Sequence, residues 1–561
     1  MNKVLGIDLG TTYSCVSYID SSGKPVVQKN SEGELTTPSV VFFESPQSIV
    51  VGTPAKESSK LYPQDVVSFA KSSIGRPGAM WYIQGAERTP EEISSYILRK
   101  VVGDAVTALQ GENKLGPGET IADVVITCPA YFGIAEREAT HNAGNLAGLN
   151  VLNIINEPTA AAITYGVGEQ SEEKVVLVYD LGGGTFDVTM IDISKDAVRV
   201  ICTGGDHSLG GKMWDDRIME YVAGEFARQT GSTVDILSDM ETFQELSLSV
   251  ERAKKMLSSR DKAPIAVNYG GDRARVELTR EKFDSLTEDL LERTILLTQE
   301  MLEEATKKGY SKNAFAEVLM VGGSTRMPQV KTRIAREFAV PVKIFDPDEA
   351  VAKGAAIFAS RQAFFSEVIE KTAEQTGQSE TQVRREIQAG KKDVRQLAKK
   401  ADIQPEEIGA GFDIVNVASR SFGTIALRGT EDATEHGEEV LYNMITKNTE
   451  LPAASSRRFF TVEPDQRTVT IRVLESLCPD KIAPPGEGTE IGEAILELPE
   501  GLPAGSPLEI EFTLSDGGLL ELEARETTHS QAVAARFETT NAVSESELRT
   551  VRQRVGNTDV Y

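Results

Sequence analysis

Two stretches of the chain repeat one pattern: residues 4–20, VLGIDLGTTYSCVSYID, and residues 175–192, VVLVYDLGGGTFDVTMID. Laid over each other without a gap, the copies place Asp8 on Asp180 and align the leucine and glycine that follow each aspartate. Each copy reads as an apolar strand, a turn rich in glycine and threonine, and a second strand. The repeat therefore predicts two related β-hairpins.

The turns of these hairpins carry the residue types that bind a phosphate group. Glycine lets backbone N–H groups approach phosphate oxygens, threonine hydroxyls add donors, and an aspartate can hold a cation or its bound water. If the hairpins face each other across a cleft, a triphosphate with magnesium fits between them. One copy is a weak signal because many ordinary hairpins look alike, but two gapless copies favour the phosphate-binding interpretation.

A third glycine-rich stretch, VLMVGGSTRMP at residues 318–328, predicts a strand, a turn and the start of a helix. Gly322 and Gly323 would let a base or ribose lie close to the backbone. Taken alone the motif is weak, since most such turns only connect a strand to a helix.

The composition is that of a large globular protein with an acidic surface. Of the 561 residues, 26% are charged and 40% are hydrophobic, and the chain is longer than the roughly 250–300 residues that one core supports. A formal net charge of −26 repels nucleic-acid backbones and anionic membrane surfaces. We therefore expect several domains, with neither nucleic acid nor a membrane as partner.

The four cysteines, Cys15, Cys128, Cys202 and Cys478, lie far apart, with no CxxC spacing and no histidine cluster nearby. This pattern favours reduced, mostly buried thiols over disulfides or a zinc site. The N-terminal MNKVLGID has no apolar signal region, and no run approaches the ~18 apolar residues of a membrane span. A cytoplasmic location is the expectation.

The first two parts of the chain differ in their periodicity. Residues 1–365 alternate short β-branched runs with longer helical patterns, which is typical of an α/β region. Residues 366–411 read as a small helical insert, with a capping-box pattern from Ser379 to Gln382.

Three further segments follow the insert. Residues 412–417 read as a linker, and strict alternation over residues 418–541, as in RTVTIRV and PLEIEFTL, predicts an antiparallel β-sandwich. Residues 542–561 start a helix, which we expect to end before it packs against anything large.

A series of motifs resembles the DnaK-like chaperones of the heat shock protein 70 family. In order they are GIDLGTTYSCV, SSIGRPG, VVITCPAYF, IINEPTAAAITYG, YDLGGGTFDV, GGDHSLGG, VERAKKMLSS, VLMVGGSTRMP and DPDEAVAKGAA, and they span nearly all of residues 3–360. A looser resemblance to the family's peptide-binding domain covers residues 414–540. The resemblance implies an actin-like ATPase fold of two duplicated lobes and a β-sandwich that grips extended peptides, with ATP or ADP, Mg²⁺ and K⁺ as cofactors.

The resemblance also implies roles at the nucleotide site. Asp8 and Asp180 match aspartates that hold the water shell of the magnesium ion, and Lys71 matches the lysine that positions the attacking water. Glu157 matches an acidic residue at the hinge between the lobes, and Asp187 one that supports the second phosphate loop. The expected nucleotide contacts are Gly10, Thr11, Thr12 and Tyr13; Gly182, Gly183, Gly184 and Thr185; Glu251, Lys254, Lys255 and Ser258; and Gly322, Gly323, Ser324, Arg326 and Asp348.

For the coupling between domains, Pro129 and Arg137 match residues that relay the nucleotide state toward the linker. In the linker itself, Asp413, Ile414 and Val415 stand where the family has a run of leucines after an aspartate, so Asp413 interrupts the apolar run. The strength of the coupling is therefore an open question at this stage.

For peptide binding, Val469 aligns with the floor of the family's pocket, with Phe459 and Ile471 nearby, and Leu427 and Val462 align with the arch over the peptide. Val469 and Ile471 share one face of a strand because side chains alternate along it. Ordinary core packing explains that spacing equally well.

Three other departures from the family bear on partners. The helical lid is missing beyond its first turns, which predicts fast peptide exchange or closure by another element. Asn153 replaces the arginine that meets J-domain co-chaperones, and Lys212 replaces an acidic residue near the rim that nucleotide exchange factors contact. Both kinds of co-chaperone are therefore expected partners whose mode of binding is altered.

The function that these residues predict is an ATP-dependent molecular chaperone, which binds and releases extended hydrophobic segments of unfolded proteins and hydrolyses ATP slowly. Two alternatives share the phosphate hairpins. A sugar or acetate kinase would need a base beside an acceptor hydroxyl and would not need the β-sandwich. An actin-like filament protein would polymerise with ATP.

Overall fold

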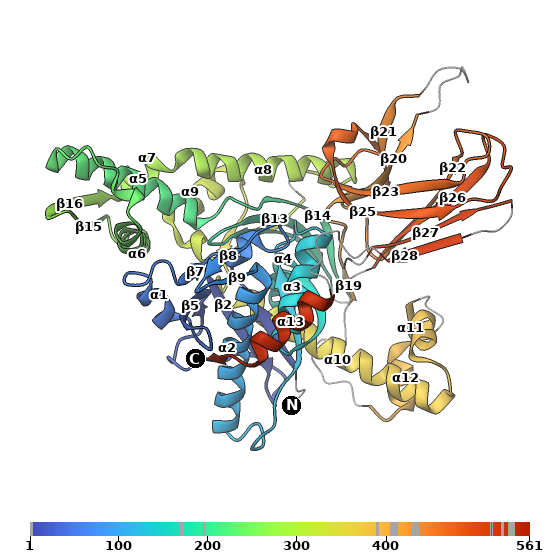
Figure 1. The fold of residues 1–561 in the computed structure, drawn as a ribbon. Helices are drawn as coiled ribbons and strands as arrows, with labels where there is room; N and C mark the ends of the chain where they lie inside the picture. The colour runs from blue at the N-terminus through green and yellow to red at the C-terminus, as the bar shows by residue number, and fades with distance from the viewer. Residues whose placement is uncertain are drawn as a thin grey trace.

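The structure, a computed structural model, describes residues 4–168, 173–194, 197–312, 314–388, 392–403, 413–428, 437–515, 518, 520–528, 532–536 and 545–561. Figure 1 shows two α/β lobes side by side, a helical extension and a β-sandwich above one end of the lobes. In the described part of the chain, no helix combines the length and apolarity that crossing a membrane requires.

The first lobe is built on a mixed sheet that contains the first hairpin. Its strands lie in the order β11 (Asn150–Asn156), β10 (Asp123–Cys128), β1 (Val4–Asp8), β2 (Tyr13–Ile19) and β3 (Pro25–Val27), and β4 (Thr37–Pro38) also pairs with β2. β1 runs parallel to β10 and antiparallel to β2. Apolar residues fill both faces of β1, as burial by helices on each side requires.

The second lobe repeats this arrangement around the second hairpin. Its strands lie in the order β18 (Val342–Ile344), β17 (Glu317–Val321), β12 (Lys174–Leu181), β13 (Phe186–Ile193), β14 (Ala197–Asp206) and β19 (Asp413–Val415). β12 is parallel to β17 and antiparallel to β13, as β1 is to β10 and β2. The duplication thus extends from the hairpins to whole sheets, and the expectation of two related lobes is confirmed.

Two helices cross between the lobes, α4 (Glu157–Gly168) and α10 (Ala350–Thr376). Glycines allow the close approach, since a Cβ atom on Gly354 would lie 1.8 Å from the carbonyl oxygen of Ala160, and one on Gly6 would lie 2.0 Å from the amide nitrogen of Ala356. The hydrophobic cluster between the sheets combines residues of both lobes and both helices. The lobes are therefore joined by a packed hinge.

Smaller elements complete each lobe. The first lobe carries the sheet β29 (Asp559–Val560), β6 (Ser48–Val51), β5 (Val40–Ser45) and β7 (Val66–Ser68), the hairpin β8 (Trp81–Ile83) and β9 (Ala86–Arg88), the short helix η1 (Ala70–Ser73), and α1 (Thr53–Ser58), α2 (Pro90–Gly111) and α3 (Ile134–Leu146). The second carries the hairpin β15 (Lys262–Tyr269) and β16 (Asp272–Thr279), the helices α5 (Gly211–Thr230), α6 (Met240–Leu257), α7 (Arg280–Leu286), α8 (Glu288–Lys307) and α9 (Pro328–Glu337), and the short helices η2 (Ile236–Ser238) and η3 (Gly323–Arg326).

The helical insert begins inside α10, which continues to Thr376, so the boundary expected at residue 365 falls within a helix. α11 (Glu380–Gln388) and α12 (Val394–Lys400) follow, and Ser379 accepts the amide N–H of Gln382 at 3.2 Å, as the capping pattern predicts. A small hydrophobic cluster that includes Val368 and Ala398 holds α12 against α10. The insert stands apart from the lobes (Figure 1).

The expected β-sandwich is present as two antiparallel sheets. One has the order β24 (Ile482–Ala483), β21 (Glu439–Ile445), β20 (Ser421–Leu427), β23 (Thr468–Ser476) and β25 (Gly488–Glu497), with η4 (Pro485–Glu487) before β25. The other has the order β22 (Ala453–Phe460), β26 (Pro507–Leu514), β27 (Leu520–Glu526) and β28 (Ala532–Arg536). Alternate residues of the two sheets form one core.

The C-terminal segment departs from expectation. α13 (Glu545–Gly556) packs on α2 and α3, and β29 pairs with β6 at the edge of the first lobe (Figure 1). Val555 is buried in the core of that lobe. The prediction that this helix packs against nothing large is wrong, because its partners lie more than 400 residues earlier in the sequence and no local pattern reveals them.

Candidate nucleotide site

The turns of the two hairpins face each other where the lobes meet. A Cβ atom on Gly183 would lie 2.3 Å from the hydroxyl oxygen of Thr12, and one on Gly184 would lie 2.6 Å from the methyl carbon of Thr11. Any side chain on these glycines would collide with the opposite turn. The two turns therefore lie opposite each other, as the sequence predicts, and the glycines permit their close approach, whereas their contact with phosphate stays a prediction.

Below the turns lies a group of four carboxylates and one amine, in which Asp8 is half-buried and the others are buried. The Nζ atom of Lys71 lies 2.5 Å from Oε1 of Glu157, and both side chains are buried. The hydroxyl of Thr127 donates to Asp8 at 3.1 Å, and the amide N–H of Ala130 donates to Asp187 at 2.9 Å. Asp180, at the end of β12, completes the group.

Burial and mutual repulsion shift these groups from their ordinary pKa values. Burial, reinforced by the charge of Glu157, raises the pKa of Asp8 to about 7 and raises the pKa values of Asp180 and Asp187. Burial alone would lower the pKa of Lys71, but the charges of Glu157 and Asp8 outweigh it and raise that pKa. One ammonium thus cannot neutralise the group.

This excess of negative charge fits a site for a hydrated cation. Among the described residues, no cluster of three or more His, Cys, Asp or Glu side chains is arranged to hold a bare metal ion. The Oδ2 atom of Asp187 is buried and has no hydrogen-bond partner. Carboxylates can hold a cation through its water shell, since oxygen ligands with retained waters are what Mg²⁺ prefers.

Lys71 is positioned by an unusual turn of the backbone. It lies in η1, which begins after Phe69, a residue with the left-handed φ angle of 61°. A bulky residue in that conformation costs of order 1 kcal/mol and persists where the surroundings enforce it. The strain lies two residues before the amine that faces Glu157.

The third glycine motif joins this site from the second lobe. Gly322 has a φ angle of +82°, and a Cβ atom there would lie 2.5 Å from a carboxylate oxygen of Asp180. The hydroxyl of Ser324 donates to the carbonyl of Gly182 at 2.8 Å, and Arg326 pairs with Asp348 at 2.5 Å. The motif therefore supports the second phosphate loop, a role that its weak sequence signal did not establish.

Lys254 is held from within the second lobe. Its amine donates to Asp215 at 2.7 Å and to the carbonyl of Gly211 at 2.7 Å, at the start of α5. Asp215 was not identified from the sequence, because an acidic residue in an amphipathic helix gives no distinctive signal. Ser258 lies at the C-terminal end of α6.

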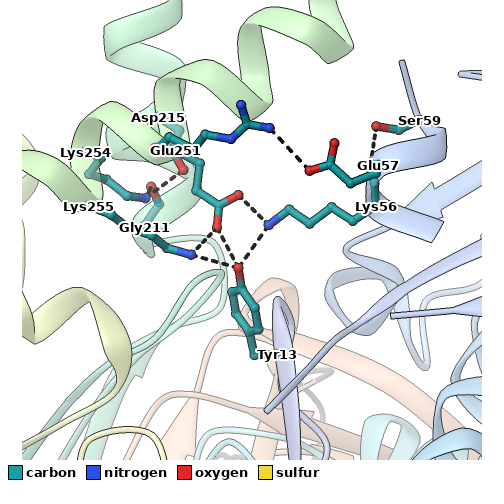
Figure 2. A network of polar contacts seen from close by, with 10 residues as sticks. Tyr13, Lys56, Glu57, Ser59, Gly211, Asp215, Glu251, Lys254 and Lys255 are labelled. Atoms are coloured by element: carbon teal, nitrogen blue, oxygen red, sulfur yellow. Dashed lines mark hydrogen bonds and ion pairs between the residues drawn. The ribbon is translucent and has the colours of Figure 1, made fainter. Parts of the chain in front are cut away.

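At the rim, four side chains from both lobes converge on one another (Figure 2). Glu251 of α6 pairs with Lys56 of α1 at 2.5 Å and with Lys255 at 2.9 Å. The Tyr13 hydroxyl donates to Glu251 at 3.0 Å, and Lys255 donates to that hydroxyl at 2.8 Å. We name Tyr13, Lys56, Glu251 and Lys255 the rim latch.

Glu251, at the centre of the rim latch, keeps its negative charge over a wide pH range. Burial alone would raise the pKa of Glu251, but the ammonium groups of Lys56 and Lys255 lower it to about 2. Lys56 was missed by the sequence analysis, because the stretch TPAKESSK around it contains no motif. Only the folded chain brings it opposite Glu251.

A chain of contacts leads from the carboxylates to the β-sandwich. The loop that follows Pro129 supplies the amide of Ala130 to Asp187, and the carbonyl oxygen of Phe132 in the same loop accepts the hydroxyl of Ser419 at 2.9 Å. Arg137 donates to Phe132 at 3.1 Å and to Asn156, the residue before Glu157. Pro129 and Arg137 thus lie between the carboxylate group and the β-sandwich, and their role as a relay stays a prediction.

The linker and the sandwich are docked on the lobes. Asp413, Ile414 and Val415 form β19, which pairs in parallel with β14, and Ile414 packs on the cluster between the lobes. Arg420 pairs with Glu475 at 2.8 Å and with Glu136 of α3 at 3.4 Å. The interrupted linker therefore still docks on the sheet of the second lobe.

Further contacts come from the loop before β22. The side-chain oxygen of Asn448 accepts the amide of Thr203 at 3.2 Å, and Glu450 pairs with Arg199 of β14 at 2.8 Å. The sandwich thus contacts the first lobe through Arg420 and the second lobe through this loop.

The residues expected at a peptide pocket have different environments. Leu427 and Val462 are 45% and 63% exposed, whereas Ile471 is 2% exposed in the sandwich core. Val469 and Phe459 are partly buried against that core, and the ring of Phe459 meets Tyr442 edge-on. Core packing accounts for Ile471, and the exposed pair is free to contact a ligand.

The chain matches the model of a known protein family. A family model described as "Hsp70 protein" matches residues 4–85 and 76–363 of the chain. The matched residues contain both hairpins, Lys71, the rim latch and the third glycine motif. They end within α10, before α11, α12 and the β-sandwich.

Proposed function

Because the chain belongs to the Hsp70 family of ATP-binding chaperones, with the actin-like ATPase fold of that family, we propose that it hydrolyses ATP slowly and couples the nucleotide state to the binding and release of extended apolar peptide segments. The observation that carries the proposal is the pairing of β19 with β14. The sheet of the second lobe contains the hairpin β12–β13, whose turn is the second proposed phosphate loop. Because β19 is an edge strand of the same sheet, that sheet also holds the linker to the sandwich.

The chain's own residues suit hydrolysis rather than covalent catalysis. Phosphoryl transfer to water needs an aligned nucleophile and compensation of charge. We assign the alignment to Lys71 and Glu157, whose buried amine and carboxylate can hold a water molecule, and the phosphate contacts to the two facing turns. Bound Mg²⁺ supplies charge neutralisation of the phosphates. Asp8, Asp180 and Asp187 would hold it through its water shell, and K⁺ is a second cation that these carboxylates would suit.

For the peptide we assign the exposed Leu427 and Val462, together with Phe459 and Val469, which are partly buried against the sandwich core. Apolar side chains flanking a sheet surface bind an extended segment through main-chain hydrogen bonds and alternating pockets. Ile471 supports the floor from within the core.

The co-chaperones belong to the same proposal. Asn153 lies on β11 of the first lobe, and Lys212 pairs with Asp216 at 2.6 Å on α5. A J-domain protein or an exchange factor that binds these surfaces meets a neutral amide and a paired lysine, so we propose partners adapted to this chain.

The test is ATP turnover measured with and without an unstructured apolar peptide. We expect the peptide to bind and to change the turnover rate. A Leu427→Asp and Val462→Asp double variant should lose both effects while its basal turnover stays unchanged, since both residues lie outside the lobes. Phosphorylation of a sugar or acetate, or sedimentation of ATP-dependent filaments, would instead support one of the alternative functions.

A further inference from the structure

The C-terminal segment, residues 545–561, is built into the edge of the first lobe. β29 runs parallel to β6 and extends the sheet β6–β5–β7. The amide N–H of Asp559 donates to the carbonyl of Gln47 at 2.9 Å, and that of Tyr561 donates to the carbonyl of Ile49 at 2.9 Å. β29 therefore covers an edge of β6 that would otherwise present unpaired backbone groups.

The helix before this strand is held at its C-terminal end. Arg99 of α2 donates to the carbonyl oxygen of Val555, in the last turn of α13, and to that of Thr558, just beyond the helix. The side chain of Val555 is 1% exposed, and Val551 and Val560 pack on the same lobe core. Hydrogen bonds and apolar packing thus fix the same stretch.

A buried ion pair adds a third contact. Glu92 of α2 is fully buried, accepting Arg88 at 2.6 Å and the hydroxyl of Tyr96 at 2.9 Å. From α13, the Nε atom of Arg554 donates to the same carboxylate at 2.9 Å. A buried carboxylate needs such partners, and one of them is supplied only by the C-terminal segment.

The other end of this segment leads into the sandwich. Residues 537–544 join the last sandwich strand, β28, to α13. A connection of this length spans at most about 30 Å when fully extended. At its opposite end the sandwich is attached through β19 to the second lobe. Its chain is therefore fixed to a different lobe at each end (Figure 1).

We propose that residues 545–561 are a tether, which keeps the β-sandwich within reach of the first lobe in every nucleotide state. A sandwich held only by its linker can swing away from the lobes. A sandwich that is held at both ends cannot swing away. Movement of one lobe against the other therefore acts on the sandwich through both of its connections. The tether concerns geometry alone and stands or falls independently of peptide binding.

The experiment measures the distance between sandwich and first lobe in the full chain. Spin labels are attached at Gln64→Cys and Glu497→Cys, both exposed positions, in a Cys478→Ser background. A site for a specific protease is inserted within residues 537–544, so that cleavage breaks the tether and leaves α13 and β29 in place. Distances are recorded with ADP and with ATP before and after cleavage.

We expect one narrow distance distribution in both nucleotide states of the uncut protein, and a shift to longer distances with ADP after cleavage. A matched site within residues 429–436, between β20 and β21, is cleaved as a control and should leave the distribution narrow. Long distances with ADP in the uncut protein would overturn the proposal, as would a cut that changes nothing. Loss of the cleaved C-terminal peptide on gel filtration would also overturn it, because a segment that does not hold the lobe cannot tether the sandwich.

Discussion

At the scale of single residues, the site is defined by a charge imbalance. Glu157, Asp180 and Asp187 lie buried, and Asp8 half-buried, around the one amine of Lys71. Burial and mutual repulsion raise the pKa values of Asp8, Asp180 and Asp187, so added positive charge would stabilise their ionised forms. In the proposed function, a magnesium nucleotide between the two facing turns would supply that charge.

The first prediction concerns Lys71. Lys71→Ala should lower ATP turnover by at least about 10²-fold, because it removes the group that aligns the attacking water. ATP affinity, measured by calorimetry, should change only a few-fold, since the phosphate turns and the rim latch remain. Lys24→Ala, at an exposed turn of the same lobe, serves as the control. Equal losses of affinity and turnover would contradict the assigned role.

The second prediction concerns the rim latch. Lys56→Ala should speed ADP release about fivefold, the effect of losing a partly exposed ion pair worth about 1 kcal/mol. The release rate is measured by stopped-flow displacement of a fluorescent nucleotide.

The same variant tests the pH dependence of the latch. The pKa of Glu251 is lowered, so the latch contributes fully above its ordinary pKa of 4.5 and is lost as the pH falls toward 2. The ratio of variant to wild-type release rates should therefore stay constant between pH 5 and 8. A ratio that falls to one within this window would show that Glu251 titrates there.

At the scale of elements, the hinge depends on a helix crossing that only glycine permits. Gly354→Ala should destabilise the ATPase lobes, because the new methyl group meets the carbonyl of Ala160 and backbone cannot move aside cheaply. Gly224→Ala is the matched control on α5, where a Cβ atom meets nothing within 4 Å. The control should be neutral or stabilising by up to about 1 kcal/mol. Thermal unfolding distinguishes the two, and equal midpoints would contradict the account.

The C-terminal helix gives a second prediction at this scale. Arg554→Ala should destabilise the first lobe by about 1–3 kcal/mol, because Glu92 keeps Arg88 and Tyr96 but loses one charged partner. Arg552→Ala, on the exposed face of α13, should have no effect. Hydrogen exchange of the β6 amides measures the difference. Unchanged protection in Arg554→Ala would show that α13 contributes nothing to the lobe.

At the scale of the whole molecule, the sequence predicts what local pattern encodes. The repeated hairpins, the glycine turns and the alternating strands of the sandwich all have short-range signatures. Lys56 has none, because its partner Glu251 lies in the other lobe. The docking of α13 and β29 has no short-range signature either. The residues on both sides of these contacts look like ordinary surface sequence, and only the folded chain brings them together. Ile471 shows a different limit of sequence reasoning. The two-residue spacing along its strand suits both a peptide-binding face and a core position, and only the structure shows that its side chain lies in the sandwich core.

The central claim is that ATP binding in the cleft acts on the peptide-binding sandwich. Release of a fluorescent apolar peptide is followed by stopped flow after ATP is added to the Lys71→Ala variant, in which binding occurs without turnover. The account predicts that ATP speeds peptide release at least tenfold and that ADP does not. Release rates that are the same with ATP, with ADP and without nucleotide would contradict it.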